Sequence, residues 1–160
     1  MAQRSGDREP YLWEEGDFKI SWMRPYHLPQ VMAIEQSSFP QPWSYSLFLS
    51  ELSNQAATYF VAFFQGKIIG YLGLWMVWGE AHITTFAIHP AYRGKGFGKK
   101  LFGYALNYAK SQGCSEVSLE VRPSNIKAQN LYHSFGFKKI GVRKRYYADG
   151  EDAWVMKKVF

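Results

Sequence analysis

Residues 84–102 read TTFAIHPAYRGKGFGKKLF, joining an apolar, strand-like run to a glycine-rich basic turn and then to a helical pattern. The glycines and cations of the turn alternate: Arg93, Gly94, Lys95, Gly96, Gly98 and Lys99. Glycines allow positive φ and close backbone approach, and turn amides in front of a helix N-terminus attract anions. The stretch therefore predicts a site for an anionic group, such as a coenzyme pyrophosphate, a nucleotide or a nucleic-acid backbone.

The glycine spacing argues against two common phosphate loops. A Walker A loop has Ser or Thr after its lysine, but Lys100 follows Lys99. A Rossmann loop has the pattern G-x-G-x-x-G, whereas this turn gives G-x-G-x-G. A basic turn that binds nothing is the remaining alternative.

Local patterns outward from this stretch predict the other elements. Before it we expect a strand at 18–23, helices within 24–39 and 44–52, a hairpin over 57–78 and a strand at 80–88. After the turn we expect a helix at 97–113, a strand at 115–121, a helix at 124–136 and a hairpin formed by 137–147 and 151–160. Hairpins followed by strand–helix–strand alternation predict an α/β (α+β) fold, with a mixed sheet and helices on it.

Length and composition predict one globular domain, because 47% of the 160 residues are hydrophobic. We expect residues 1–17 to be a flexible N-terminal extension and residues 18–160 to form the domain. The single cysteine, Cys114, allows no disulfide within the chain and fits a reducing compartment. Apolar runs are too short to span a bilayer as a helix, so we expect a soluble, cytoplasmic protein without a membrane partner.

The positive charge is unevenly distributed. The net charge is +6, and residues 22–160 alone carry +8. Most of the excess lies in two clusters: Arg93, Lys95, Lys99 and Lys100, and Lys138, Lys139, Arg143, Lys144 and Arg145. Such clusters suit a polyanion, so a nucleic-acid-binding module is one hypothesis, although solvated basic faces are common. No RNA-recognition motif supports it.

Several motifs resemble the GNAT acetyltransferase superfamily. RGKGFG, residues 93–98, fits the superfamily's Q/R-x-x-G-x-G/A signature. Further stretches follow in the superfamily's order, namely SWMRPYHLPQVMAIEQSSFPQPWSYSLF, SLEVRPSNIKAQNLYHSFGF and RYYADGEDAWVMKK. The resemblance covers roughly residues 18–158 and is strongest to bacterial RimI-type ribosomal-protein alanine N-acetyltransferases. It implies a GNAT fold, with a mostly antiparallel sheet, a parallel pair splayed at the acetyl-CoA site, and helices on both faces.

The resemblance also implies the coenzyme contacts. The backbone of Phe86, Ala87 and Ile88 would pair with the pantetheine arm of acetyl-CoA, and a strand N–H near Ala87 or Ile88 would meet the oxyanion of the transferred group. The main-chain amides of the turn would hold the pyrophosphate; these are Arg93, Gly94, Lys95, Gly96, Phe97, Gly98 and Lys99. Asn125 would touch the coenzyme arm, although a helix cap is an alternative role.

Two residues are implied as catalytic. Glu120 would take the proton of the acceptor amine, directly or through water; the alternative is a strand carboxylate paired with Arg122 or Lys138. Tyr132 would donate a proton to the departing thiolate, although tyrosines more often serve packing. Metal-ligand spacing is absent from the four histidines, His27, His82, His89 and His133, so we expect no metal and structural roles for each.

The acceptor is implied to be an N-terminal peptide of a small-subunit ribosomal protein. The groove walls would contain Phe39, Pro40, Trp43, Tyr146 and Tyr147, unless these aromatics only close the sheet's end. Gly94 and Thr85 depart from the usual RimI-type pattern, which carries a second basic residue and an asparagine there. Another protein N-terminus, a lysine or a small amine is therefore a second acceptor hypothesis, and nucleic acid would be met only incidentally at the ribosome.

Overall fold

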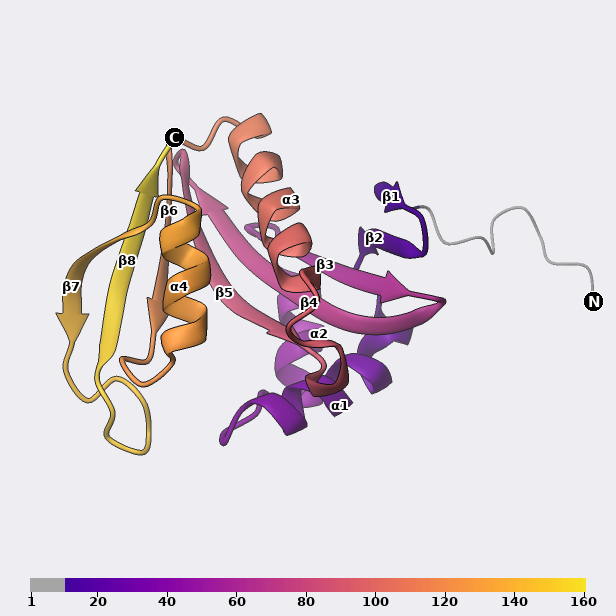
Figure 1. Cartoon of the computed structure of the whole chain (residues 1–160), viewed down its shortest axis with the longest axis horizontal. Helices are drawn as coiled ribbons and strands as arrows, with labels where there is room; N and C mark the ends of the chain where they lie inside the picture. Colours follow the sequence, from indigo (N-terminus) through magenta and orange to yellow (C-terminus); the bar gives the residue numbers. More distant parts are fainter. Residues whose placement is uncertain (1–10) are drawn as a thin grey trace, which may run out of the picture.

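The computed structural model describes residues 11–160, which form one mixed sheet with helices on both faces (Figure 1). The strands are β1 (Trp13–Glu15), β2 (Phe18–Trp22), β3 (Ala57–Phe64), β4 (Lys67–Val77), β5 (Glu80–Ile88), β6 (Glu116–Val121), β7 (Lys138–Arg143) and β8 (Ala153–Val159). The helices are α1 (Leu28–Ser38), α2 (Tyr45–Leu52), α3 (Phe97–Ser111) and α4 (Ile126–Ser134), with 3₁₀ turns η2 (Pro25–His27) and η3 (Pro90–Tyr92). The expected element order is confirmed, with β1 added.

The sheet has the strand order β1-β2-β3-β4-β5-β6-β8-β7. Only β5 and β6 pair in parallel, and only over Glu80–His82 with Glu116–Ser118. Beyond these residues both strands continue without pairing to each other, β5 to Ile88 and β6 to Val121. The splayed parallel pair implied by the resemblance is thus confirmed, and it opens the sheet in its middle.

Two hydrophobic cores lie on opposite faces of the sheet. The pleat of β3 alternates between them: Phe60 and Ala62 pack toward α3, while Tyr59, Val61 and Phe63 pack toward α1 and α2. In Figure 1, α3 and α4 lie in front of the strands and α1 and α2 lie beyond them. The predicted coverage of both faces is therefore confirmed.

Helices α3 and α4 meet through an aromatic cluster. Phe102 of α3 is fully buried, and its ring lies 5.2 Å from Tyr132, 5.2 Å from Phe135 and 5.6 Å from Phe137. Phe86 of β5 lies 5.5 Å from the same ring. Phe102 therefore fixes α4 relative to β5 across the splay.

A strand at Trp13–Glu15 was not expected from the sequence. β1 pairs antiparallel with β2, and Lys100 of α3 lies 2.8 Å from Glu15. Part of the expected flexible extension, residues 11–17, is therefore joined to the sheet. A three-residue strand of Trp, Glu and Glu has little alternation to reveal it. Residues 1–10 lie outside the described residues, and the domain boundary stays a prediction.

We predict that Phe102→Ala lowers the free energy of unfolding by about 3–5 kcal/mol, because it removes a fully buried ring and leaves a cavity between α3 and α4. Urea unfolding followed by circular dichroism measures this. Ile140→Ala on β7, where the side chain is 58% exposed, is the control and should stay within about 0.5 kcal/mol of wild type. An equal loss in both variants would contradict the packing role.

Candidate active site

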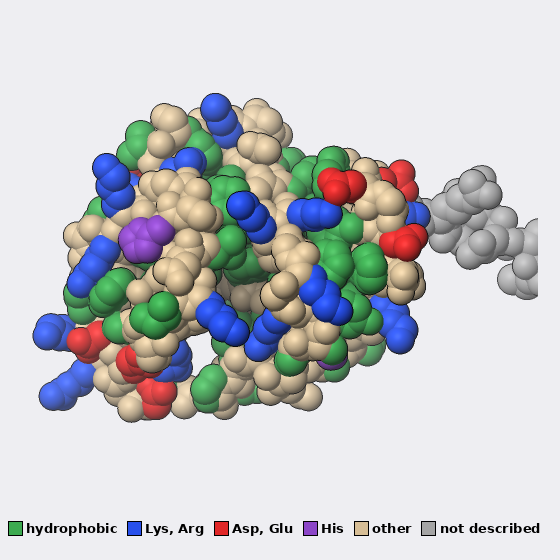
Figure 2. All heavy atoms as spheres, in the orientation of Figure 1, with side chains coloured by type: hydrophobic (Ala, Val, Ile, Leu, Met, Phe, Trp, Pro, Cys, Tyr) green, Lys and Arg blue, Asp and Glu red, His purple; other side chains and the backbone are tan. Residues whose placement is uncertain are grey.

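A cleft of about 950 Å³ opens where β5 and β6 separate. One wall comes from α1 and the loop after it, and the other from the β6–α4 connection and the β7–β8 loop. Figure 2 shows the molecule hollowed between these parts. Nine of the residues predicted for the site line this cleft: Phe39, Pro40, Trp43, Phe86, Glu120, Asn125, Tyr132, Tyr146 and Tyr147. Ala87, Ile88 and the turn residues 93–99 are not among the residues that line it.

The backbone of β5 turns toward the cleft at alternate residues. His89 N–H donates to Ile69 O of β4 over 2.7 Å, and in an antiparallel pair this direction repeats every second residue. Ala87 therefore directs its N–H and C=O toward β4, while Phe86 and Ile88 direct theirs to the side that β6 has left. The N–H and C=O of Phe86 and the N–H of Ile88 are thus placed to pair with an extended ligand, whereas Ile88 O already accepts a hydrogen bond from Arg93 Nε over 2.7 Å. The side chain of Ala87 packs on the sheet face that α1 and α2 cover.

The glycine turn connects β5 to α3 in a left-handed conformation. Gly94 has φ 77° and Gly96 has φ 86°, values that favour glycine. Because α3 begins at Phe97, the amides of its first turn have no intrahelical acceptor. These N–H groups can therefore bind an anion. Gly98 serves close approach instead of positive φ: it lies within α3, where an added Cβ would contact Ile88 and Phe86 at 3.4 and 3.5 Å.

Arg93 uses its side chain within the protein. Its Nε donates to Ile88 O over 2.7 Å, and its Nη2 donates to Ser38 Oγ at the end of α1 over 2.9 Å. We had expected Arg93 to add a full charge to the anion site, but the guanidinium instead ties the turn to β5 and α1. Its main-chain amide remains the part assigned to the coenzyme.

Glu120 lies between two basic side chains at the point where the strands separate. Its Oε2 is 2.8 Å from His82 Nε2, and its Oε1 is 3.3 Å from Arg143 Nε. His82 Nδ1 is also 3.0 Å from Ser118 Oγ. Glu120 is thus paired, but with His82 and Arg143 and not with Arg122 or Lys138, the partners named in the alternative interpretation. Sequence spacing alone does not reveal His82, because parallel pairing of β5 with β6 brings it to Glu120.

Tyr132 of α4 lines the same cleft as Glu120. Its ring is held by Phe102 and Phe137, and its side chain is 8% exposed. Burial raises the pKa of Tyr132 above its usual value, and the nearby Tyr147 raises it further. The phenol therefore keeps its proton at neutral pH and can donate it.

Asn125 caps α4, as one of the two expected roles requires. Its side-chain oxygen accepts the Ala128 N–H over 3.1 Å. The side-chain amide nitrogen has no hydrogen bond to the part of the chain that the structure describes, and Asn125 lines the cleft. Capping and contact with a ligand are therefore compatible.

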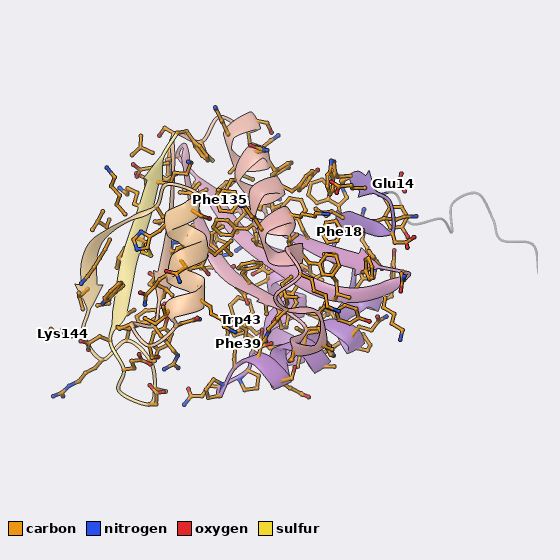
Figure 3. All side chains as sticks on the ribbon, in the orientation of Figure 1. Glu14, Phe18, Phe39, Trp43, Phe135 and Lys144 are labelled. Carbon is orange, nitrogen blue, oxygen red and sulfur yellow. The ribbon has the colours of Figure 1, made fainter. Side chains whose placement is uncertain are left out.

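The loop after α1 is held by a buried carboxylate. Glu35 is 1% exposed; its Oε2 accepts the Trp43 N–H over 2.9 Å, and its Oε1 accepts the Tyr71 hydroxyl. Burial raises the pKa of Glu35 above its usual value. Figure 3 shows Phe39 and Trp43 on this loop, facing the part of the molecule that carries α4. Sequence periodicity places Glu35 on the helix but does not identify this contact.

The β7–β8 loop supplies the facing aromatic pair. The rings of Tyr146 and Tyr147 lie 5.0 Å apart, edge to face, and both residues line the cleft. Burial raises the pKa of Tyr147 to about 12. Aromatic side chains thus lie on both walls of the cleft, as expected.

No group of three or more His, Cys, Asp or Glu that could hold a metal ion occurs in residues 11–160. In the same residues, no helix is both long and apolar enough to cross a membrane.

A mixed sheet split at one parallel pair, with a glycine turn and helix N-terminus at the split, defines the N-acetyltransferase class. The family described as "Acetyltransferase (GNAT) family" matches residues 28–137, and the chain belongs to this family. The acetyl donor of the family is acetyl-CoA.

Relatives named as N-acetyltransferases agree with this class. A Bacillus subtilis protein named "Putative ribosomal protein bS18-alanine N-acetyltransferase" is 45% identical over 136 residues, covering 84% of this chain and 90% of the relative. A Haemophilus ducreyi ribosomal protein bS18-alanine N-acetyltransferase is 37% identical and covers 74% and 81%. The crystal structure of the ribosomal-protein-S18-alanine N-acetyltransferase from Escherichia coli has a TM-score of 0.83 and 32% identity, covering 89% and 93%.

We predict a loss of about 1–3 kcal/mol in the free energy of unfolding for Glu35→Ala, because the Trp43 N–H loses its acceptor.

Burial raises the Glu35 pKa, so the folded state holds the carboxyl proton of Glu35 more tightly than the unfolded chain does. Wild type therefore loses stability as the pH rises above 4.5 and through the folded pKa.

Glu35→Gln cannot ionise at this position. Its free energy of unfolding, relative to that of wild type, should therefore be more favourable at about pH 7 than at about pH 4. Urea unfolding across this range measures the difference. If Glu35→Gln becomes less stable relative to wild type as the pH rises, the predicted direction of the pH dependence is contradicted.

Proposed function

We propose that this protein is an acetyl-CoA-dependent N-α-acetyltransferase that acts on the N-terminal alanine of a small-subunit ribosomal protein. The observation that carries the proposal is that Glu120 of β6 and Tyr132 of α4 line the same cleft, which opens where β5 and β6 separate. The Bacillus, Haemophilus and Escherichia relatives are named as ribosomal-protein alanine N-acetyltransferases, which supports this choice of acceptor. The cytoplasmic location expected from the sequence stays a prediction.

The coenzyme would lie along β5 and reach the glycine turn. The N–H and C=O of Phe86 and the N–H of Ile88, which β6 does not pair, suit the amides of a pantetheine arm. The amides from Arg93 to Lys99 would hold the pyrophosphate, and Asn125 would touch the arm. The bound coenzyme supplies the activated acetyl group, and the residues below act on the protons.

Proton removal would fall to Glu120. An α-amino group has a pKa of about 7.7–8.0 and is largely protonated at neutral pH, so it must lose a proton to attack a thioester. Glu120 can accept this proton, directly or through water, and is oriented by His82 and Arg143. Tyr132 would donate a proton to the departing thiolate from its buried position.

The acceptor peptide would pass between two aromatic walls. Phe39, Pro40 and Trp43 form one wall, and Tyr146 and Tyr147 form the other. Rigid rings bind a peptide with little loss of side-chain entropy. Another protein N-terminus is the second candidate acceptor, favoured by a Sulfurisphaera tokodaii relative named "N-alpha-acetyltransferase", which is 33% identical and covers 88% of this chain and 92% of its own.

The direct test combines coenzyme binding with turnover. We expect acetyl-CoA to raise the melting temperature, since a ligand at about 100 times its Kd stabilises by about 2.7 kcal/mol. We also expect thiol release with a peptide that begins with alanine. A shift without release would send the search to other acceptors, and no shift would overturn the coenzyme site.

We predict that Glu120→Gln lowers kcat by roughly 10²–10⁴-fold while the thermal shift with acetyl-CoA is kept, because only the proton acceptor is lost. Glu116→Gln is the matched control: it lies on the same strand and loses a comparable ion pair, Glu116–Lys157 at 2.9 Å. Equal rates for Glu120→Gln and wild type across pH would remove Glu120 as the base.

We predict that Tyr132→Phe slows transfer by roughly 10²-fold or more, since it removes the hydroxyl that would protonate the thiolate. Steady-state kinetics with the alanine peptide measure this. Tyr104→Phe removes a hydroxyl from α3 away from the cleft and should keep full activity. Full activity of Tyr132→Phe would exclude its role as the acid.

A further inference from the structure

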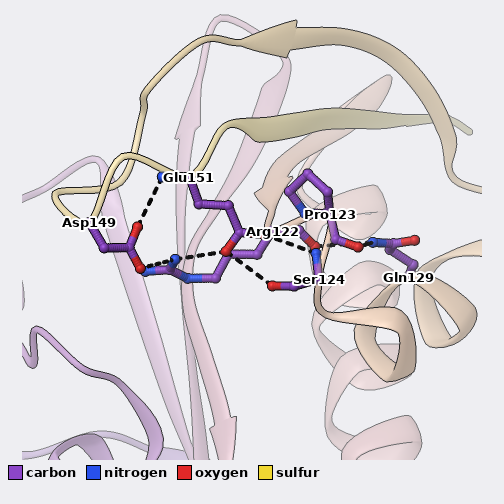
Figure 4. A network of polar contacts seen from close by, with 6 residues as sticks. All are labelled: Arg122, Pro123, Ser124, Gln129, Asp149 and Glu151. Atoms are coloured by element: carbon purple, nitrogen blue, oxygen red, sulfur yellow. Dashed lines mark hydrogen bonds and ion pairs between the residues drawn. The ribbon is translucent and has the colours of Figure 1, made fainter.

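Arg122 joins the end of β6 to the loop between β7 and β8 (Figure 4). Its Nη1 donates to Asp149 Oδ2 over 2.7 Å and to Glu151 Oε1 over 2.9 Å. Its guanidinium carbon lies 3.9 Å from the centre of the Tyr147 ring. One side chain thus contacts three residues of the loop, including one aromatic residue of the proposed acceptor wall.

The two carboxylates also organise the loop. Glu151 accepts the Ser124 N–H and the Ser124 hydroxyl, each over 3.0 Å. Asp149 Oδ1 accepts the Glu151 N–H over 3.0 Å, and Tyr147 N–H donates to Glu151 O over 3.1 Å. The loop is therefore closed on itself and fixed to the residue that precedes Asn125.

The main chain of Arg122 is fixed from the other side. Gln129 of α4 is 5% exposed, and its Nε2 donates to Arg122 O over 3.0 Å and to Pro123 O over 2.8 Å. Arg122 follows Glu120 by two residues, and α4 carries Tyr132. The backbone of Arg122 is therefore held close to Glu120 in the chain and is hydrogen-bonded to the helix that carries Tyr132. Its side chain reaches the proposed acceptor wall.

The guanidinium suits this role in a way that a lysine does not. Its Nη1 bonds both carboxylates while the planar face of the guanidinium stacks on the Tyr147 ring, and an ammonium has no such face. Without it, Asp149 and Glu151 would face each other as like charges, and the Tyr147 ring would lose the surface on which it rests. The loop would then be attached to the β6–α4 connection only through the bonds between Glu151 and Ser124.

We propose that Arg122 is a positioning residue for the acceptor: it holds the Tyr147 ring and residues 146–151 at the depth where an acceptor peptide passes toward Glu120. This inference rests on the proposed N-acetyltransferase function. It predicts an effect on acceptor binding that acts through Tyr147, with coenzyme binding unchanged.

The test compares Arg122→Met and Arg122→Lys in steady-state kinetics with the alanine peptide. We expect the peptide KM to rise roughly tenfold or more in Arg122→Met, with kcat changed by less than about threefold and the thermal shift with acetyl-CoA kept. Arg122→Lys should bring the KM only part of the way back to the wild-type value, because lysine keeps the charge but has no planar face to stack on Tyr147. Arg145→Met removes an arginine from the same loop and should keep the wild-type KM.

A double-mutant cycle separates positioning from direct contact. Tyr147→Ala should also raise the peptide KM, and adding Arg122→Met to it should raise KM little further, because the ring that Arg122 supports is gone. Additive effects would overturn the proposal by showing that Arg122 acts independently of Tyr147. An unchanged KM in both Arg122 variants, or an equal change in Arg145→Met, would overturn it as well.

If Arg122→Met does not fold, Arg122→Lys and its cycle with Tyr147→Ala carry the same test. Failure of the proposed function looks different: wild type itself would then release no thiol with the peptide, whatever residue stands at position 122.

Discussion

The parallel pairing of β5 and β6 ends after three residues, and the site depends on this early separation. A strand that leaves its neighbour exposes N–H and C=O groups, which are costly to bury without partners. Here these groups are the N–H and C=O of Phe86 and the N–H of Ile88 on the way to the glycine turn, while Ile88 O is satisfied by Arg93 Nε. The opening is stable because the sheet is continuous on both sides, through β4 and through β8.

Carboxylates with fixed partners then shape the opening. Glu35 holds the loop after α1 through Trp43, Glu120 lies between His82 and Arg143, and Asp149 and Glu151 hold the last loop through Arg122. The two walls are thus fixed by different chemistry. The first uses a buried carboxylate whose pKa is raised by desolvation, and the second uses carboxylates whose pKa values are lowered, chiefly by the Glu151 N–H for Asp149 and by the Ser124 hydroxyl for Glu151. Acid should therefore affect them in opposite directions: protonation relieves the burial cost at Glu35 and weakens the contacts around Arg122.

Sequence patterns predicted most of the fold because the strands and helices have clear periodicity, glycine stops and caps such as Ser44 and Asn125. They did not reveal β1, which is too short to alternate. They placed nine predicted residues on the cleft, since family motifs mark local segments. They could not reveal His82 beside Glu120, Trp43 on Glu35 or Arg122 on Asp149, because these contacts join segments 8 to 38 residues apart through tertiary pairing. Arg93 shows the same limit, since its charge was visible but its two acceptors were not.

The strand order β6-β8-β7 has a consequence for synthesis. β8, at Ala153–Val159, is the last described strand, yet it lies between β6 and β7 and pairs with both. A nascent chain that has reached only residue 152 already contains the glycine turn, Glu120, Tyr132 and both loop tyrosines. However, β6 still has an open edge, and β7 has no strand to pair with. Because β8 joins β7 to β6, the wall that carries Tyr146 and Tyr147 can take its place only after residues 153–159 have been synthesised.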